Sequence, residues 1–235
     1  MTHTKKNKHT MKIIDCPRDA MQGIVDFIPT QDKIRYIQSI LHVGFDTVDF
    51  GSFVSPKAIP QMRDTQEVLA GLDLRKTNSK LLAIVANLRG AEDSSAFEQI
   101  DYLGFPLSIS ETFQQRNTNK SIAQALEVVA QIQELCHKRN KTQVVYVSMG
   151  FGNPYDEPFN TDIVAEFVHR LAELEITTIA LSDTIGSSTP ELIKEIFEAS
   201  IQAFPQVEFG AHLHSTPNTA AQKIQAALEA GCKRI

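Results

Sequence analysis

Two histidines near the end of the chain and a carboxylate near its start could hold one metal ion. His212 and His214 are separated by one apolar residue, so on a strand both imidazoles point to the same face. Asp19, beside Arg18, would add an oxygen ligand. We predict that Asp19, His212 and His214 bind a divalent cation. A mixed oxygen and nitrogen set that leaves room for substrate and water suits Mg²⁺ or Mn²⁺ better than zinc. The alternative is a pair of ordinary histidines on a half-exposed strand.

Three charged residues are candidates for catalysis. Arg18 offers a fixed cation that could stabilise a developing oxyanion such as an enolate. Asp49 ends an otherwise apolar strand, where a buried carboxylate needs a partner, and Arg18 is the partner we expect. Asp183 follows another strand, and its alternative role is at the entry to a helix.

Apolar, β-rich runs alternate with helix-period segments along the whole chain, which is typical of repeated βα units around a parallel sheet. Ser121 and Thr189-Pro190 are typical helix starts, and a further helix is expected from Pro217. The predicted strands are Met11 to Ile14, Thr47 to Phe50, Leu81 to Val85, Phe105 to Ile109 (less clear because of Pro106), Val144 to Val147, Thr177 to Leu181 and Val207 to Leu213, and Lys233 to Ile235 would open an eighth.

The pattern therefore predicts an α/β fold: a (β/α)8 TIM barrel that is incomplete, with seven βα units and the start of strand eight. A doubly wound open sheet is the alternative, but the turn after its first strand would normally be rich in glycine. In a barrel the active site lies at the carboxyl ends of the strands. Five further polar residues there are predicted to bind substrate: Gln22, Ser52, Ser110, Tyr146 and Ser148.

Composition narrows the class of protein. The chain has a net charge of −5 and no basic stripe, which argues against nucleic-acid binding. Its three cysteines lack metal-knuckle or disulfide spacing, and no apolar run is long enough to span a membrane, so we predict a cytoplasmic protein with no membrane partner. Residues 1–10 are predicted to be a disordered polar leader and residues 11–235 the barrel domain.

Several blocks together resemble the 3-hydroxy-3-methylglutaryl-CoA lyase family of metal-dependent barrel lyases. The most specific block is Ser52-Phe53-Val54-Ser55-Pro56-Lys57. The other matching blocks are Pro17 to Gln22, Pro60-Gln61-Met62 with Asp64, Ser110-Glu111 with Phe113 and Arg116-Asn117, Tyr146-Val147-Ser148, Pro154-Tyr155, Ser182 to Gly186, and His212-Leu213-His214.

The resemblance implies a carbon–carbon lyase that cleaves a 3-hydroxyacyl-CoA by a retro-Claisen reaction, giving acetyl-CoA and a keto acid, as in leucine catabolism. It implies that a divalent cation chelates the substrate, that Arg18 neutralises the thioester enolate, and that Asp183 or a metal-site group moves the hydroxyl proton. An acyl-CoA is the expected partner, and a homodimer is possible. The alternatives are a Claisen-condensing synthase or aldolase of the same superfamily, and an inactive truncated barrel.

The sequence departs from the family pattern at three places. Asp49 replaces the usual glutamate, and Ser215-Thr216-Pro217-Asn218 replaces Asp-Thr-Tyr-Gly after the histidine pair. The family continues into a glycine-rich loop that bears a catalytic cysteine and an asparagine metal ligand, which these 235 residues do not include. We therefore expect the chain to be a C-terminally truncated lyase.

Overall fold

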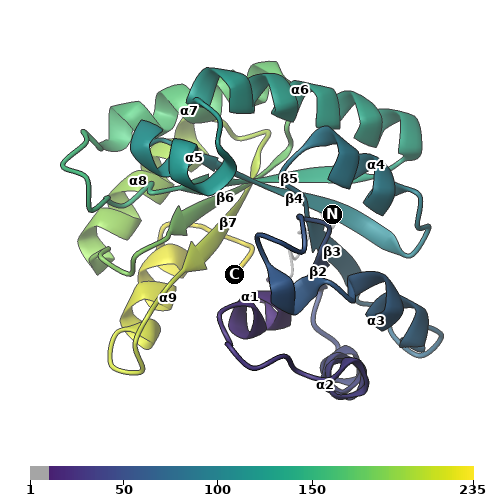
Figure 1. Ribbon diagram of the computed structural model, residues 1–235. Helices are drawn as coiled ribbons and strands as arrows, with labels where there is room; N and C mark the ends of the chain where they lie inside the picture. Colours follow the sequence, from purple (N-terminus) through teal and green to yellow (C-terminus); the bar gives the residue numbers. More distant parts are fainter. Residues whose placement is uncertain (1–10) are drawn as a thin grey trace, which may run out of the picture.

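The computed structural model describes residues 11–235 and shows a seven-stranded parallel sheet surrounded by helices (Figure 1). The strands lie in chain order, and each pairs in parallel with the next. They are β1 (Ile14–Asp15), β2 (Thr47–Ser52), β3 (Lys80–Ile84), β4 (Ile100–Ser108), β5 (Thr142–Ser148), β6 (Thr178–Asp183) and β7 (Glu208–Leu213).

The end of the chain occupies the place between β7 and β1. Arg234 forms a parallel bridge with Gly210 of β7 and another with Lys12, just before β1. The amide of Ala211 donates to the carbonyl of Arg234 at 2.8 Å, and the amide of Ile235 donates to that of Lys12 at 2.9 Å. These bridges stand where an eighth strand would begin, so the predicted incomplete (β/α)8 barrel is confirmed and the open-sheet alternative is wrong.

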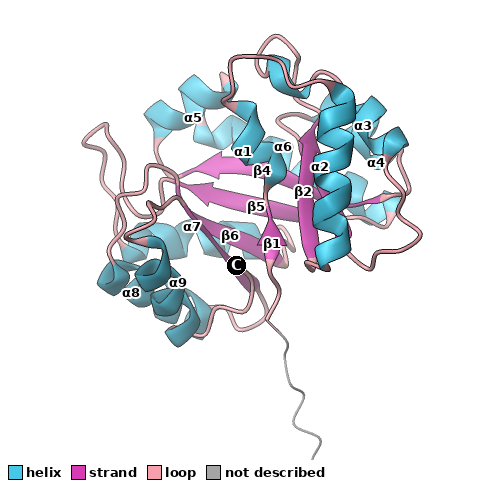
Figure 2. Cartoon of the chain, turned by 90° about the horizontal axis from the view of Figure 1, so that it is seen from below, coloured by secondary structure: helices cyan, strands magenta, loops and turns pink. Residues whose placement is uncertain are grey.

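Helices cover the outer face of the sheet, with α8 and α9 on one side and α2, α3 and α4 on the other (Figure 2). They are α1 (Pro17–Gln22), α2 (Thr30–Val43), α3 (Thr65–Gly71), α4 (Leu88–Ser95), α5 (Glu111–Thr118), α6 (Ile122–Arg139), α7 (Thr161–Glu173), α8 (Pro190–Ala203) and α9 (Ala220–Glu229), with the 3₁₀ turn η1 (Pro60–Met62). Two predicted helix starts are confirmed: Ser121 forms a capping box for α6, and the Thr189 side chain accepts from the amide of Leu192 in α8.

Four short helices, α1, α3, α4 and α5, were not predicted, because six to eight residues are too few to build a clear helical period. Several boundaries also differ from the prediction, most of them by one or two residues, and two lie near the ends of the chain. The first strand is Ile14–Asp15 rather than Met11 to Ile14, and the last helix begins at Ala220 rather than Pro217, since the preceding turn is bonded through Thr216 and Thr219.

β4 begins five residues earlier than predicted and includes Pro106. The carbonyl of Gly104 accepts a hydrogen bond from the amide of Val85, which follows β3. Backbone groups of successive residues in a strand point alternately to its two neighbours, so Pro106, two residues after Gly104, also points toward the β3 side. Pairing with β3 ends at Gly104. The missing N–H of Pro106 therefore costs no ladder bond, and proline is tolerated inside the strand.

The core has two parts. A large cluster fills the space between the sheet and the helices, and a smaller one fills the barrel interior with Leu82, Ile84, Tyr102, Val144 and Ala180. Packed side chains thus close the interior below, and polar groups gather above them at the carboxyl ends of the strands. The predicted leader lies outside the described residues. Within residues 11–235, none of the helices is long and apolar enough to cross a membrane.

Candidate active site

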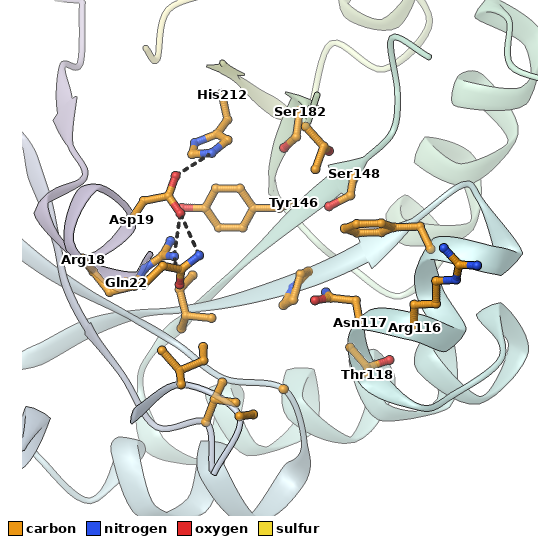
Figure 3. A pocket seen from close by; sticks show the side chains of 18 of the residues that line it. Arg18, Asp19, Gln22, Arg116, Asn117, Thr118, Tyr146, Ser148, Ser182 and His212 are labelled. Carbon is orange, nitrogen blue, oxygen red and sulfur yellow. Dashed lines mark hydrogen bonds and ion pairs between the residues drawn. The ribbon is translucent and has the colours of Figure 1, made fainter. Parts of the chain in front are cut away.

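Asp19, His212 and His214 meet at the carboxyl end of the barrel, although almost two hundred residues separate them in sequence (Figure 3 shows Asp19 and His212). One ligand atom from each lies within 4.8 Å of the other two. Oδ2 of Asp19 is 3.4 Å from Nε2 of His214 and 3.7 Å from Nε2 of His212. His212 belongs to β7 and His214 follows it directly, so both rings face the first βα turn, as the HxH spacing predicts.

Asp19 reaches the histidines because α1 starts immediately after β1. Pro17 occupies the first helical turn, where a missing N–H removes no helical bond, and Asp19 lies in the same turn. The site is thus built from elements at the two ends of the sheet, β1 with α1 and β7.

Arg18 is buried and binds three oxygen-bearing side chains. Its Nε and Nη2 form a forked contact with Asp49, with Nη2 2.6 Å from Oδ2. Its Nη1 donates to Asp19 Oδ1 and to Gln22 Oε1, both at 2.8 Å. Gln22 also donates to Asp19 at 3.2 Å. The expected contact between Arg18 and Asp49 is therefore present, and it fixes the guanidinium that in turn orients Asp19.

The electrostatics of the cluster favour a charged carboxylate beside one neutral imidazole. The hydrogen bond from His214, with Arg18 and His212 nearby, holds the pKa of Asp19 well below its usual value. Burial lowers the pKa of His212 to about 4, so this ring is neutral near pH 7. The hydrogen bond to Asp19 raises the pKa of His214.

The buried pair of Asp49 and Arg18 also has shifted pKa values. Burial raises the pKa of Asp49 although Arg18 opposes the shift, and the pairing keeps the pKa of Arg18 above its usual value.

Tyr146 packs against His212, one member of the cluster formed by Asp19, His212 and His214. Its ring meets that of His212 edge to face, with centroids 5.4 Å apart, and restricts the orientation of the imidazole. Burial raises the pKa of the phenol, so Tyr146 is a neutral group in the site.

A cavity of about 440 Å³ opens from the cluster. Its polar wall is formed by Arg18, Asp19, Gln22, Ser148, Ser182, Thr184, His212 and His214, and its apolar wall by Val54, Ala58, Ile59, Ile84, Ala86, Pro106 and Phe113, with Tyr146 between them. Arg116, Asn117 and Thr118 of α5 lie at the side away from Asp19 (Figure 3). A hollow of similar volume shares Asp19, Tyr146 and both histidines and runs toward Arg234 and Ile235.

Seven of the eleven predicted site residues line this cavity: Arg18, Asp19, Gln22, Tyr146, Ser148, His212 and His214. The other four, Asp49, Ser52, Ser110 and Asp183, are at most 3% exposed and are absent from the wall. Asp49 lies beneath Arg18. Ser52 Oγ bonds to the carbonyl of Ile84 and the amide of Val54, and Ser110 caps α5 by accepting from the amide of Phe113.

Asp183 lies behind the cavity wall rather than in it. Its Oδ1 accepts from the amide of Ser187 at 2.9 Å, and its Oδ2 accepts from the amide and hydroxyl of Ser188 and from Lys223. The neighbouring residues Ser182 and Thr184 contribute to the cavity instead.

Sequence reasoning included Ser182, Thr184, Arg116 and Asn117 in the blocks that resemble the family but predicted no individual binding or catalytic role for them, and it did not single out Thr118. Ser182 and Thr184 lie at the end of β6, so an inspection of the polar residues at strand ends could have predicted that they line the cavity. Arg116 and Asn117 lie on a helix beyond β4, so an inspection of strand ends does not find them.

The sequence profile of the HMGL-like family matches residues 10–235. The chain belongs to the HMGL-like family. Among its relatives is the hydroxymethylglutaryl-CoA lyase YngG of Bacillus subtilis, which is 34% identical over 92% of this chain and 71% of the relative. The 3-hydroxy-3-isohexenylglutaryl-CoA/hydroxymethylglutaryl-CoA lyase of Pseudomonas aeruginosa is 33% identical over the same shares of the two proteins.

Solved structures of this family have the same fold. The HMG-CoA lyase of Bacillus subtilis superimposes with a TM-score of 0.90 at 32% identity, over 96% of this chain and 76% of that one. An HMG-CoA lyase of Acinetobacter baumannii in complex with coenzyme A and 3-methylmalate gives a TM-score of 0.88 at 28% identity, over 98% and 75%. The predicted family resemblance and the prediction of a carbon–carbon lyase are thus confirmed for this HMGL-like chain.

Proposed function

We propose that this protein catalyses metal-dependent retro-Claisen cleavage of a 3-hydroxyacyl-CoA, with 3-hydroxy-3-methylglutaryl-CoA as the first substrate to test. The products are acetyl-CoA and a keto acid. The observation that carries the proposal is the meeting of Asp19, His212 and His214 beside the guanidinium of Arg18 at the wall of one cavity.

The donor set fits a divalent cation. A carboxylate oxygen and two imidazole nitrogens lie within reach of a common centre, and the half-exposed His214 leaves the cavity side accessible to substrate or water. Such a set suits Mg²⁺ or Mn²⁺, with Asp19, His212 and His214 as ligands. A bound cation would supply Lewis acidity to the substrate's carbonyl and hydroxyl oxygens and lower the pKa of that hydroxyl.

The protein side chains then have separate tasks. Cleavage of the bond between C2 and C3 of the acyl group turns the 3-hydroxyl carbon into a ketone and leaves negative charge on the thioester enolate. Arg18 would receive that charge, since its position is fixed by Asp49 before substrate binds. Gln22, Tyr146 and Ser148 would contact the substrate, because each of them lines the cavity.

The hydroxyl proton must move to a group that faces the substrate. Asp19, His212 and His214 line the cavity, whereas Asp183 does not. We therefore assign proton removal to one of the metal-site groups and give Asp183, Asp49, Ser52 and Ser110 supporting roles behind the wall. The enolate must afterwards take up a proton to give acetyl-CoA.

The experiment is a cleavage assay on the purified chain with 3-hydroxy-3-methylglutaryl-CoA and added Mg²⁺ or Mn²⁺, in which acetyl-CoA and acetoacetate are measured separately. We expect the two products in equal amounts, and a loss of both in His212→Ala. Folded, metal-loaded protein that forms neither product would contradict the proposal and favour an inactive barrel. Product formation only in the direction of condensation, from acetyl-CoA and a keto acid, would favour the synthase alternative.

Two partner assignments and a cellular location accompany the proposal. The acyl-CoA partner has support from the Acinetobacter baumannii lyase, which was solved with coenzyme A. A homodimer and a cytoplasmic location stay predictions, and the relatives include mitochondrial lyases of mammals.

A further inference from the structure

Lys223 of α9 is a buried lysine whose ammonium group has three hydrogen-bond acceptors. The residue is 3% exposed. Its Nζ lies 2.7 Å from Oδ2 of Asp183, 2.9 Å from the carbonyl of Gly186 and 3.2 Å from the carbonyl of His214. An ammonium has three N–H donors, and here each donor has one acceptor. The cation therefore joins three segments: α9, the loop after β6 and the end of β7.

The backbone of His214 is held on both sides by this arrangement. Its amide donates to the carbonyl of Asp183 at 3.3 Å, and its carbonyl accepts from Lys223. A Cβ added at Gly186, whose φ is +73°, would stand 3.3 Å from that same carbonyl, so the loop packs closely against His214. The side chain that reaches Asp19 thus extends from a backbone with little freedom.

We propose that Lys223 is a positioning residue for the metal site: it fixes the backbone of His214, with Asp183 as its counter-ion, and so holds the imidazole of His214 toward Asp19. The proposal rests on the proposed function, because it makes His214 a metal ligand. In this proposal Asp183 neutralises the charge of Lys223, a role that needs no contact with the cavity.

The chemistry of the pair explains why a lysine is needed here. A buried ammonium is costly unless it is paired and all its protons are bonded, and both conditions are met. A neutral side chain could not serve three acceptors and would leave the carboxylate of Asp183 without its cation. Groups that orient metal ligands from behind usually change metal affinity by about 10- to 100-fold when they are removed.

The test is Mn²⁺ affinity, measured by the loss of the free-ion signal in electron paramagnetic resonance. We expect Lys223→Met to weaken Mn²⁺ binding by about 10- to 100-fold. Lys223→Met alone leaves the buried carboxylate of Asp183 without its cation, so the double variant Lys223→Met with Asp183→Asn, which removes that charge, is the one expected to fold. Its Mn²⁺ affinity should be as low as that of the single variant. Folded Lys223→Met protein with the affinity of the wild type would overturn the proposal.

The chain offers a matched control in Lys33, another buried lysine. Lys33 is 2% exposed, its Nζ is 2.6 Å from Oδ1 of Asp64, and it also contacts the carbonyl of Gln61 and the ring of Phe27. None of these contacts belongs to β6, β7 or α9. Lys33→Met should lower stability in the same way and leave Mn²⁺ affinity within about twofold of the wild type. A purely structural effect would reduce the affinity equally in both variants, and that result would also overturn the proposal.

A second measurement separates this inference from the lyase proposal. Amide hydrogen exchange in metal-free protein should be faster at His214 and in residues 184–188 of Lys223→Met, while the interior of β6 and β7 keeps its protection. If the wild type binds no Mn²⁺, the metal-dependent function fails, and the exchange result still decides the role of Lys223. Unchanged exchange at His214 would show that Lys223 does not position it.

Discussion

The guanidinium of Arg18 rests on the carboxylate of Asp49, which is completely buried, with Nη2 2.6 Å from Oδ2. The pair connects α1 to β2 and leaves one nitrogen of Arg18 for Asp19 and Gln22. Asp49 therefore orients Arg18, and through it Asp19, from a buried position that is absent from the cavity wall.

Replacing Asp49 with asparagine should reduce both stability and turnover. Arg18 would lose the charged half of a buried pair, which typically costs about 3 kcal/mol in the free energy of unfolding. Urea denaturation measures this loss, and kcat in the cleavage assay measures the effect on Arg18. The exposed pair of Arg35 and Asp32 is the control, since Arg35→Ala should cost less than about 1 kcal/mol. An Asp49→Asn enzyme with wild-type kcat would show that Arg18 needs no fixed orientation.

The affinity for Mn²⁺ should rise with pH around neutrality and then level off. A metal binds the neutral imidazole, so protonated His214, whose pKa is raised, must release its proton first. His212, with a pKa of about 4, is already neutral and releases none near pH 7. Calorimetry in buffers of different ionisation enthalpy should thus detect proton release that declines as pH rises.

Two histidine variants test which ring is responsible. His214→Ala should bind Mn²⁺ more weakly and abolish the proton release. His169→Ala should change neither quantity, because His169 is an exposed residue of α7 beside Glu173. Proton release that persists in His214→Ala would assign the titrating group to another side chain.

Gln143 of β5 should be a site where substitution stabilises the protein. It is 2% exposed, and neither its amide nitrogen nor its amide oxygen has a hydrogen-bond partner among the described residues. Since Val145, two positions on, belongs to the outer core, the side chain of Gln143 also faces the helices. Gln143→Met should raise the free energy of unfolding by about 1 kcal/mol, because an unbonded buried amide is removed.

Gln114 is the matched control. It is 1% exposed, but its oxygen accepts from the amide of Ser108 at 2.8 Å and its nitrogen donates to Thr118 at 2.6 Å. Gln114→Met should therefore destabilise the protein by about 2 kcal/mol. Equal effects of the two substitutions in urea denaturation would contradict this interpretation of Gln143.

Local patterns in the sequence predicted the parts of the fold and site that depend on short periods. The alternation of strands and helices predicted the barrel, the two-residue spacing of His212 and His214 predicted that they share a face, and the cost of a buried carboxylate predicted that Asp49 pairs with Arg18. Each of these inferences needs only neighbouring residues and the rule that strand ends meet at one edge.

Contacts between distant segments could not be predicted in this way. Lys223 and Asp183 are 40 residues apart, and nothing in the helical pattern of α9 shows that a lysine on it is buried. Arg116 reaches the cavity from α5, a helix too short to give a periodic signal. Such contacts depend on how whole elements pack together, which the sequence alone does not reveal.

Arg116 should affect substrate binding more than chemistry. It lines the cavity on the side away from Asp19 and His212 (Figure 3), and its guanidinium carbon lies 5.0 Å from the centre of the Tyr155 ring. A cation placed there can attract the phosphates of an acyl-CoA without contacting the acyl group that reacts. Arg116→Ala should raise KM about tenfold, which corresponds to one charged hydrogen bond, and leave kcat nearly unchanged.

Salt and a second arginine sharpen this test of Arg116. The difference in KM between wild type and Arg116→Ala should shrink at high ionic strength, because salt screens the attraction between the guanidinium and the phosphates. Arg170→Ala, which removes an arginine near the Phe167 ring of α7, lies outside the cavity and should leave KM unchanged. A fall in kcat with constant KM would instead place Arg116 in contact with the reacting end of the substrate, because only an interaction made in the transition state alone changes kcat in that way.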